Sequence, residues 1–76
     1  MPRYFFDTYD GTVILDDEGR MLPDLASARL EARHLLQDLI RHAAPERDES
    51  RFRADIRDES GRVVVTATLV LAYENG

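Results

Sequence analysis

Adjacent members of a set of three polar side chains, spaced four residues apart, could share a metal ion: His34, Asp38 and His42. Histidine and carboxylate side chains one helical turn apart are common zinc ligands. On a helix, however, His34 and His42 would lie about 12 Å apart along the axis, which is too far for one ion to hold all three. We therefore expect a solvated helix face with weak ion pairs, and no metal site.

Five acidic residues gather around what we expect to be the first hairpin: Asp7, Asp10, Asp16, Asp17 and Glu18. Clustered carboxylates can bind Ca²⁺ or act as an acid–base pair. Their spacing lacks the alternating acids followed by glycine of a Ca²⁺-binding loop. Turns favour aspartate for local reasons, because its side chain bonds the backbone two residues on. We therefore expect turn residues here rather than a site.

Nucleophilic catalysis and phosphate binding both lack a motif in this sequence. None of the three serines has a histidine near it in the sequence, so no pair of nucleophile and base is indicated. The four glycines are isolated, so there is no glycine-rich phosphate loop. A chain of 76 residues also leaves little room for a cleft. We expect no enzymatic activity and no cofactor.

The one concentration of basic residues surrounds a predicted strand and the turn after it: Arg51, Arg53, Arg57 and Arg62. Arg53 and Arg57 fall on the same face of the strand, so they could contact phosphate or an acidic partner. Acidic residues are interleaved with them, which favours ion pairs within the sheet. The formal net charge of −5 repels nucleic acid and anionic membranes at long range, and we expect neither as a partner.

A small number of elements must position these residues. Residues 4–9 are rich in aromatics, which predicts a strand, and aromatics on both of its faces place it inside the sheet. Asp10-Gly11 accepts the positive φ angles of a two-residue type I′ turn, and residues 12–15 would form the returning strand. A second turn follows at residues 16–19, where Gly19 can adopt a left-handed conformation.

An amphipathic helix is predicted between Asp24 and Pro45. Asp24 is a suitable N-cap, because its carboxylate accepts bonds from the free N–H groups of the first turn. Pro45 ends the helix, since proline disfavours a helical conformation in the residue before it. Apolar residues recur at intervals of three and four along one stripe: Leu25, Ala28, Ala32, Leu35, Leu36, Leu39, Ile40 and Ala43.

Two further strands form a second hairpin. Residues 51–58 alternate between apolar and charged, residues 58–61 form a four-residue turn with Gly61 suited to a bulge, and residues 63–73 form a long strand. The resulting order is ββαββ, an α+β fold in which one amphipathic helix packs on one face of an antiparallel four-stranded sheet. At this length the chain makes a single domain, residues 1–76.

The last strand is predicted to take part in association. Its eleven residues span about 36 Å, whereas residues 51–58 span only about 26 Å, so part of it would lack a partner within the chain. So short a domain has little stability to spare, and it contains no cysteine for disulfides. We expect a homodimer through this strand or the open sheet face, and an unidentified protein partner. The candidate interface is the half-apolar second face: Phe5, Tyr9, Val64, Thr66, Thr68, Val70 and Ala72.

Two observations bear on location. Arg3 is followed by only three apolar residues, fewer than a secretory signal requires. The longest apolar stretch, residues 63–73, is too short to span a membrane. We therefore expect a cytoplasmic protein with no membrane partner.

Several stretches along the chain resemble one known family. They are the opening MPRYFFD, the turn DDEG at residues 16–19, the helix entry LPDL at 22–25, ARLEA at 28–32, and IRDESGR at 56–62. With them the chain resembles a family of small uncharacterised bacterial proteins, frequent in alphaproteobacteria such as rhizobia. It departs from that family in its short Asp10-Gly11 turn, where relatives often carry a longer loop. The family is one of unknown function, so the resemblance implies no activity and no site residues.

The first 25 residues are also similar to the antitoxin of a HicAB-type toxin–antitoxin pair, which begins with an aromatic hairpin before a Pro-Asp-Leu helix entry. Such antitoxins usually carry a DNA-binding segment that this sequence does not show. Two functions follow. One is a non-catalytic, homodimeric protein-interaction or accessory domain. The alternative is an antitoxin-like regulator that binds a toxin or nucleic acid through the arginine-bearing strand.

Overall fold

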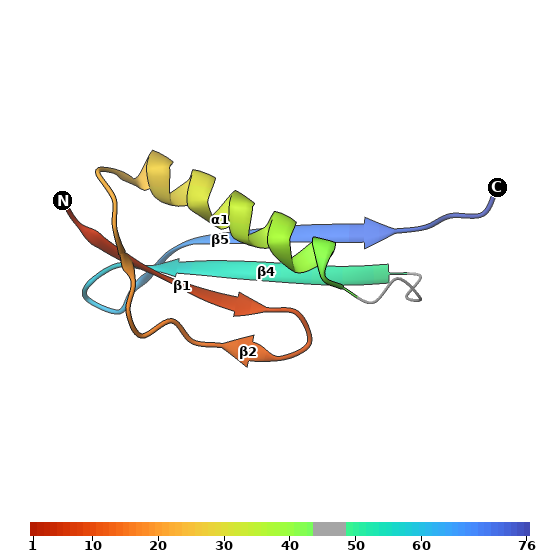
Figure 1. The fold of residues 1–76 in the computed structure, drawn as a ribbon, viewed down its shortest axis with the longest axis horizontal. Coiled ribbons are helices and arrows are strands. Elements are labelled where there is room, and N and C mark those ends of the chain that lie inside the picture. The colour runs from red at the N-terminus through yellow and green to blue at the C-terminus, as the bar shows by residue number, and fades with distance from the viewer. Residues whose placement is uncertain (44–48) are drawn as a thin grey trace.

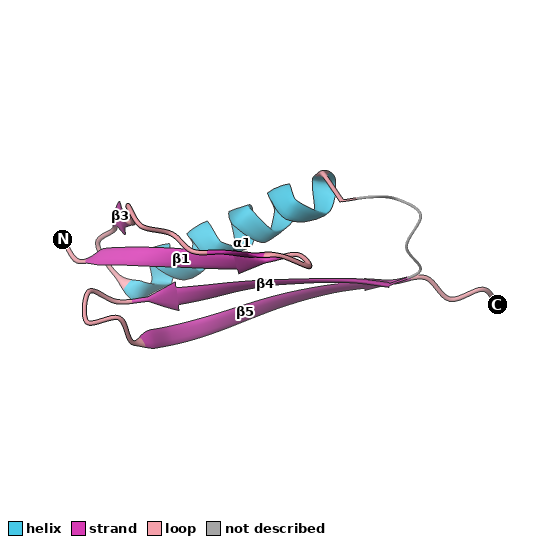
Figure 2. Ribbon diagram, turned by 90° about the horizontal axis from the view of Figure 1, so that it is seen from below, coloured by secondary structure: helices cyan, strands magenta, loops and turns pink. Residues whose placement is uncertain are grey.

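One helix lies across one face of an antiparallel sheet in the computed structural model, which describes residues 1–43 and 49–76 (Figure 1). The elements are β1 (Arg3–Tyr9), β2 (Val13–Ile14), β3 (Arg20–Met21), α1 (Leu25–Arg41), β4 (Glu49–Arg57) and β5 (Val63–Ala72). The strand order is β2-β1-β4-β5, and β3 also pairs with β1. Figure 2 shows α1 on one side of the strands. The predicted α+β fold is confirmed.

The first hairpin differs from its prediction, because the returning strand is broken in two. β2 pairs with the end of β1, where Tyr9 faces Val13, and β3 pairs with its beginning, where Arg3 faces Met21. The sheet therefore has five strands rather than four. In the gap between β2 and β3, the side chain of Asp16 accepts the backbone N–H of Phe6 at 3.0 Å. The Asp16 carboxylate thus accepts a β1 N–H group where no strand pairs with it on that side.

The predicted type I′ turn at Asp10-Gly11 is wrong. Because Tyr9 pairs with Val13, the connecting loop has three residues, and Asp10 N–H donates to the Thr12 carbonyl at 3.4 Å. A type I′ turn needs two central residues with positive φ. Gly11 has a φ of +106°, but no residue other than glycine has a positive φ in the described ranges.

Helix α1 begins as predicted. The Asp24 carboxylate accepts the Ser27 N–H at 2.8 Å, which makes Asp24 the N-cap. The last helical residue is Arg41, and the predicted stop at Pro45 lies outside the described residues. Leu25 is 39% exposed, so the buried stripe begins at Ala28 rather than at the first residue of the helix.

The core lies between α1 and the two central strands. Ala28 and Ala32 of α1 and Ala54 of β4 are fully buried, which lets the helix backbone approach the sheet closely. The Phe6, Phe52 and Ile56 side chains fill the space around them. The buried apolar core consists of Phe6, Ala28, Ala32, Leu36, Phe52, Ala54 and Ile56.

The prediction that part of the last strand lacks a partner within the chain is also wrong. β4 begins at Glu49 rather than at Arg51, and its pairing runs from Glu49 opposite Ala72 to Arg57 opposite Val63. A register shift at Ile56/Arg57 accommodates the extra residue of β5. Along one side, β5 is therefore paired over its whole length. Its other side is an edge of the sheet.

Gly19 offers a test of this arrangement. Its φ is +71°, and a Cβ there would lie 2.9 Å from the backbone oxygen of Tyr4. Gly11 also has a positive φ but open space around it. We expect Gly11→Ala to lower the free energy of unfolding by about 1–2 kcal/mol through backbone strain alone. Gly19→Ala should cost about 2 kcal/mol more, because strand β1 must move. Urea denaturation measures both, and equal losses would contradict this account.

Candidate functional site

The face of the sheet opposite α1 is the candidate site, and we call it the open face. Side chains alternate along strands, so the neighbours of the buried Phe6, Phe52 and Ile56 point away from the helix. The register places the members side by side on three strands. The open face consists of Phe5, Asp7, Tyr9, Arg51, Arg53, Asp55, Arg57, Val64, Thr66, Thr68, Val70 and Ala72.

This surface joins two groups that the sequence had suggested separately. All seven residues of the candidate interface lie on it, and so do three of the four arginines proposed as anion contacts. Arg62 stands apart in the turn before β5, where its backbone N–H donates to Asp58 at 3.1 Å. The open face is therefore a mixed surface, with aromatic, aliphatic and guanidinium groups within one sheet.

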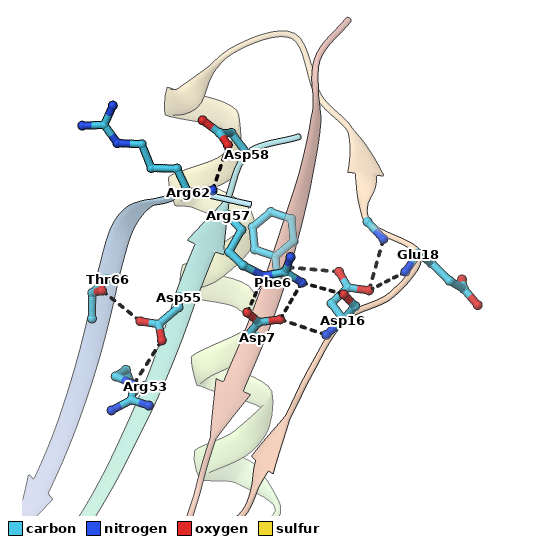
Figure 3. A network of polar contacts seen from close by, with 11 residues as sticks. Phe6, Asp7, Asp16, Glu18, Arg53, Asp55, Arg57, Asp58, Arg62 and Thr66 are labelled. Atoms are coloured by element: carbon cyan, nitrogen blue, oxygen red, sulfur yellow. Dashed lines mark hydrogen bonds and ion pairs between the residues drawn. The ribbon is translucent and has the colours of Figure 1, made fainter. Parts of the chain in front are cut away.

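Cross-strand pairs order the central part of the open face. Arg53 lies opposite Tyr9, and its guanidinium carbon is 5.1 Å from the ring centre, a cation–π contact. The Nε of Arg53 is 3.4 Å from an oxygen of Asp55. Thr66 donates a hydrogen bond of 2.8 Å to the same carboxylate (Figure 3). The charged side chains here are held by neighbours on the same face.

A second group anchors the open face to the irregular edge of the sheet. The Arg57 Nε and Nη2 atoms donate to the Asp7 carboxylate at 2.6 and 3.1 Å, and Nη2 also donates to the Asp16 carbonyl at 2.8 Å (Figure 3). Asp7 in turn accepts the Asp16 N–H at 2.9 Å. The Arg57 guanidinium also lies 5.1 Å from the ring centre of Phe5. Arg57 therefore joins three segments of the chain, and its contact with Asp7 is an ion pair within the sheet.

Asp16 completes this network from the loop. Its carboxylate accepts backbone N–H groups from Phe6 at 3.0 Å, Glu18 at 3.1 Å and Gly19 at 3.1 Å. One side chain thus satisfies donors on β1 and in the loop that returns to β3. The Asp7–Asp16–Arg57 network is a structural clamp between the centre of the sheet and its edge.

The electrostatics of the clamp keep its two carboxylates ionised. The Arg57 hydrogen bonds hold the pKa of Asp7 below its ordinary value of 3.8, although burial opposes them. Burial also raises the pKa of Asp16, but its three backbone N–H donors outweigh it, and the net shift is downward. Both groups stay ionised near neutral pH. A general acid would need the opposite shift.

These shifts set a pH dependence of stability. A carboxylate whose pKa is lower in the folded state stabilises the fold above its unfolded pKa, and this contribution is lost as the pH falls. Asp24 and Asp58 shift in the same direction, through hydrogen bonds from Ser27 and Ser60. We expect the free energy of unfolding to be level from neutral pH to about pH 5 and to fall below that. Urea titrations across this range measure it, and a stability that rises on acidification would contradict the clamp.

The predicted helix cluster lies on the solvated side of α1. Asp38 forms an ion pair with Arg41 at 3.2 Å, and the His42 ring nitrogen lies 2.8 Å from the Asp38 carbonyl. In residues 1–43 and 49–76, no three histidine or acidic side chains come together in a way that could hold a metal ion. Within the same ranges, no helix is both long and apolar enough to cross a membrane.

Sequence reasoning missed the clamp because its members are far apart in the chain. Asp7 and Arg57 are 50 residues apart, and only the pairing of β1 with β4 brings them together. A signal was present, since Asp7, Asp16, Gly19 and Arg57 all fall within the stretches that carried the family resemblance. Asp58 and Gly61 belong to the same stretches and also have a structural role. The Gly61 N–H donates to the Asp58 carbonyl at 3.0 Å and closes the β4–β5 turn.

A family model described as "Domain of unknown function (DUF6894)" matches residues 3–70, from the start of β1 to within β5. Comparison with curated proteins and with solved structures found no match.

Proposed function

The chain belongs to the DUF6894 family of domains of unknown function, and we propose that it is a non-catalytic protein-interaction module that forms a homodimer through the open face. The observation that carries this proposal is the composition of that face. Val64 is 37% and Val70 48% exposed, Val70 pairs with Arg51 on β4, and the aromatic rings of Phe5 and Tyr9 lie one strand further on, on β1. Aromatic and arginine side chains are the residues that interface cores favour.

Charge supports a second copy of the chain as the occupant. Arg53 and Asp55 lie side by side on the open face. A two-fold axis between them would bring Arg53 of one copy next to Asp55 of the other, so the face is self-complementary. Face-to-face packing of two antiparallel sheets also buries the exposed valines. A domain of 76 residues gains stability from such a contact.

The roles found for the charged groups support the absence of catalysis. Asp7 and Asp16 are ionised members of a structural clamp, and Arg57 is bound between them. No specific contact favours the antitoxin-like alternative, because Arg53 and Arg57 are both held by carboxylates within the chain. A bacterial, cytoplasmic protein remains our expectation.

Molar mass measured by light scattering at micromolar concentration tests the proposal. We expect twice the 8.7 kDa of one chain, with dissociation on dilution. A mass of one chain over the whole range would refute the dimer. An increase in molar mass when RNA or DNA is added would favour the antitoxin-like alternative.

A further inference from the structure

The outer side of β5 is an edge without the usual protection. The strand Val63–Ala72 contains no charged residue, no proline and no glycine. Sheets normally protect such an edge with charges, proline, bulges or a covering segment. The register shift at Ile56/Arg57 lies at the beginning of β5, so the rest of its edge is regular. This edge can accept hydrogen bonds from an added strand.

A groove runs beside this edge on the helix side of the sheet. Two adjoining hollows of about 300 and 290 Å³ lie between α1 and β5, and they share Arg33, Leu36 and Thr68. The floor is formed by apolar residues of β5, among them Val65 and Leu69. In Figure 1, α1 runs across β5 towards β4, and Figure 2 shows the helix on one side of the strands. Side chains of an added strand that point to the helix side would enter this groove.

The rim of the groove is positively charged. Arg29 and Arg33 are exposed on α1, and within the described part of the chain neither side chain has a hydrogen bond or an ion pair. The other helix and strand arginines do have partners there, such as Arg20 with Glu31. The two positions are one turn apart, about 6 Å along the helix axis. Alternate side chains of a strand are spaced about 6.7 Å apart, so two carboxylates at alternate positions can face both guanidinium groups.

We propose that this groove binds an acidic, extended segment of a different protein by strand addition to β5. Its backbone pairs with the β5 edge, and two acidic side chains at alternate positions pair with Arg29 and Arg33. A second copy of the chain does not supply this chemistry. Its own β5 is uncharged, and it would bring a second pair of these arginines against the first. The groove lies on the helix side of the sheet and meets the open face at the β5 edge, where Thr66 and Thr68 line both surfaces. The proposal does not depend on the dimer.

A labelled model peptide tests the proposal on the full chain. The peptide has threonine on one face and the side chains Val, Glu, Glu and Val on the other, and a matched peptide carries glutamine in place of both glutamates. Fluorescence anisotropy measures affinity, and NMR shifts of β5 amides locate the site. We expect about tenfold weaker binding for the glutamine peptide and for the variant Arg29→Gln/Arg33→Gln. The variant Arg41→Gln/Arg62→Gln has the same net charge and should bind as the natural chain does.

Three outcomes would overturn the proposal. The first is no binding of the glutamate peptide up to millimolar concentration. The second is equal binding by both peptides or by both arginine variants. The third is a β5 edge already protected from hydrogen exchange in the isolated protein by a second copy. Because Arg29 and Arg33 are exposed, circular dichroism should show that both variants keep the fold. A monomeric molar mass would refute the open-face dimer and leave this result unchanged.

Discussion

Replacing Asp16 with alanine is expected to lower the free energy of unfolding by about 2–4 kcal/mol. The carboxylate accepts three backbone N–H groups, from Phe6, Glu18 and Gly19. Without it, the half-buried donors of Phe6 and Gly19 lose their partner, and the gap between β2 and β3 loses the group that closes it. A domain of this size seldom has more than about 3–5 kcal/mol in total, so the variant should be substantially unfolded.

Asp17→Ala is the matched control for this prediction. Asp17 is the next residue and is exposed, and its replacement by alanine removes the same charge. Within the described part of the chain, no hydrogen bond to its carboxylate is found. We expect a change within about 0.5 kcal/mol, as for most surface substitutions. Urea denaturation compares the two, and similar stabilities would show that the clamp does not hold the edge of the sheet.

Val70→Arg is expected to weaken the homodimer about 50-fold. Val70 is an exposed residue of β5 on the open face, and its partner across the sheet is Arg51. An arginine there places a further cation beside Arg51 and has to be buried when the second copy binds. The monomer should keep its fold, because the side chain is 48% exposed.

Leu30→Arg is the control for the dimer prediction. Leu30 is 56% exposed on α1, and the change from an apolar residue to arginine is the same. In sedimentation equilibrium, Leu30→Arg should have the same dimer dissociation constant as the unsubstituted chain. Val70→Arg should be monomeric at the same concentration. Equal dissociation constants would show that the open face is not the interface.

Local patterns in the sequence were enough to predict the main elements. The alternation of Phe52, Ala54 and Ile56 with charged residues identified β4 and its buried face. The three-and-four spacing of Ala28, Ala32 and Leu36 identified the buried stripe of α1. These signals depend only on the period of a helix or a strand, which short stretches of sequence already contain.

The remaining features depend on contacts between distant segments. The break between β2 and β3 follows from the bond of Asp16 to Phe6, which exists only after the loop has folded onto β1. Strand lengths alone did not reveal that β4 begins at Glu49. The placement of Arg53 and Arg57 on the same face as Phe5 and Tyr9 follows from the β1–β4 register. Such pairings between distant segments are not encoded in any one stretch.

The central claim is that two copies meet through the open face, and isotope-filtered NMR on a mixture of labelled and unlabelled chains tests it most directly. The account predicts contacts between copies that involve Tyr9, Val64 and Val70, with none to Leu30 on the outer side of α1. Contacts between copies confined to the backbone edge of β5, or their complete absence, would contradict it.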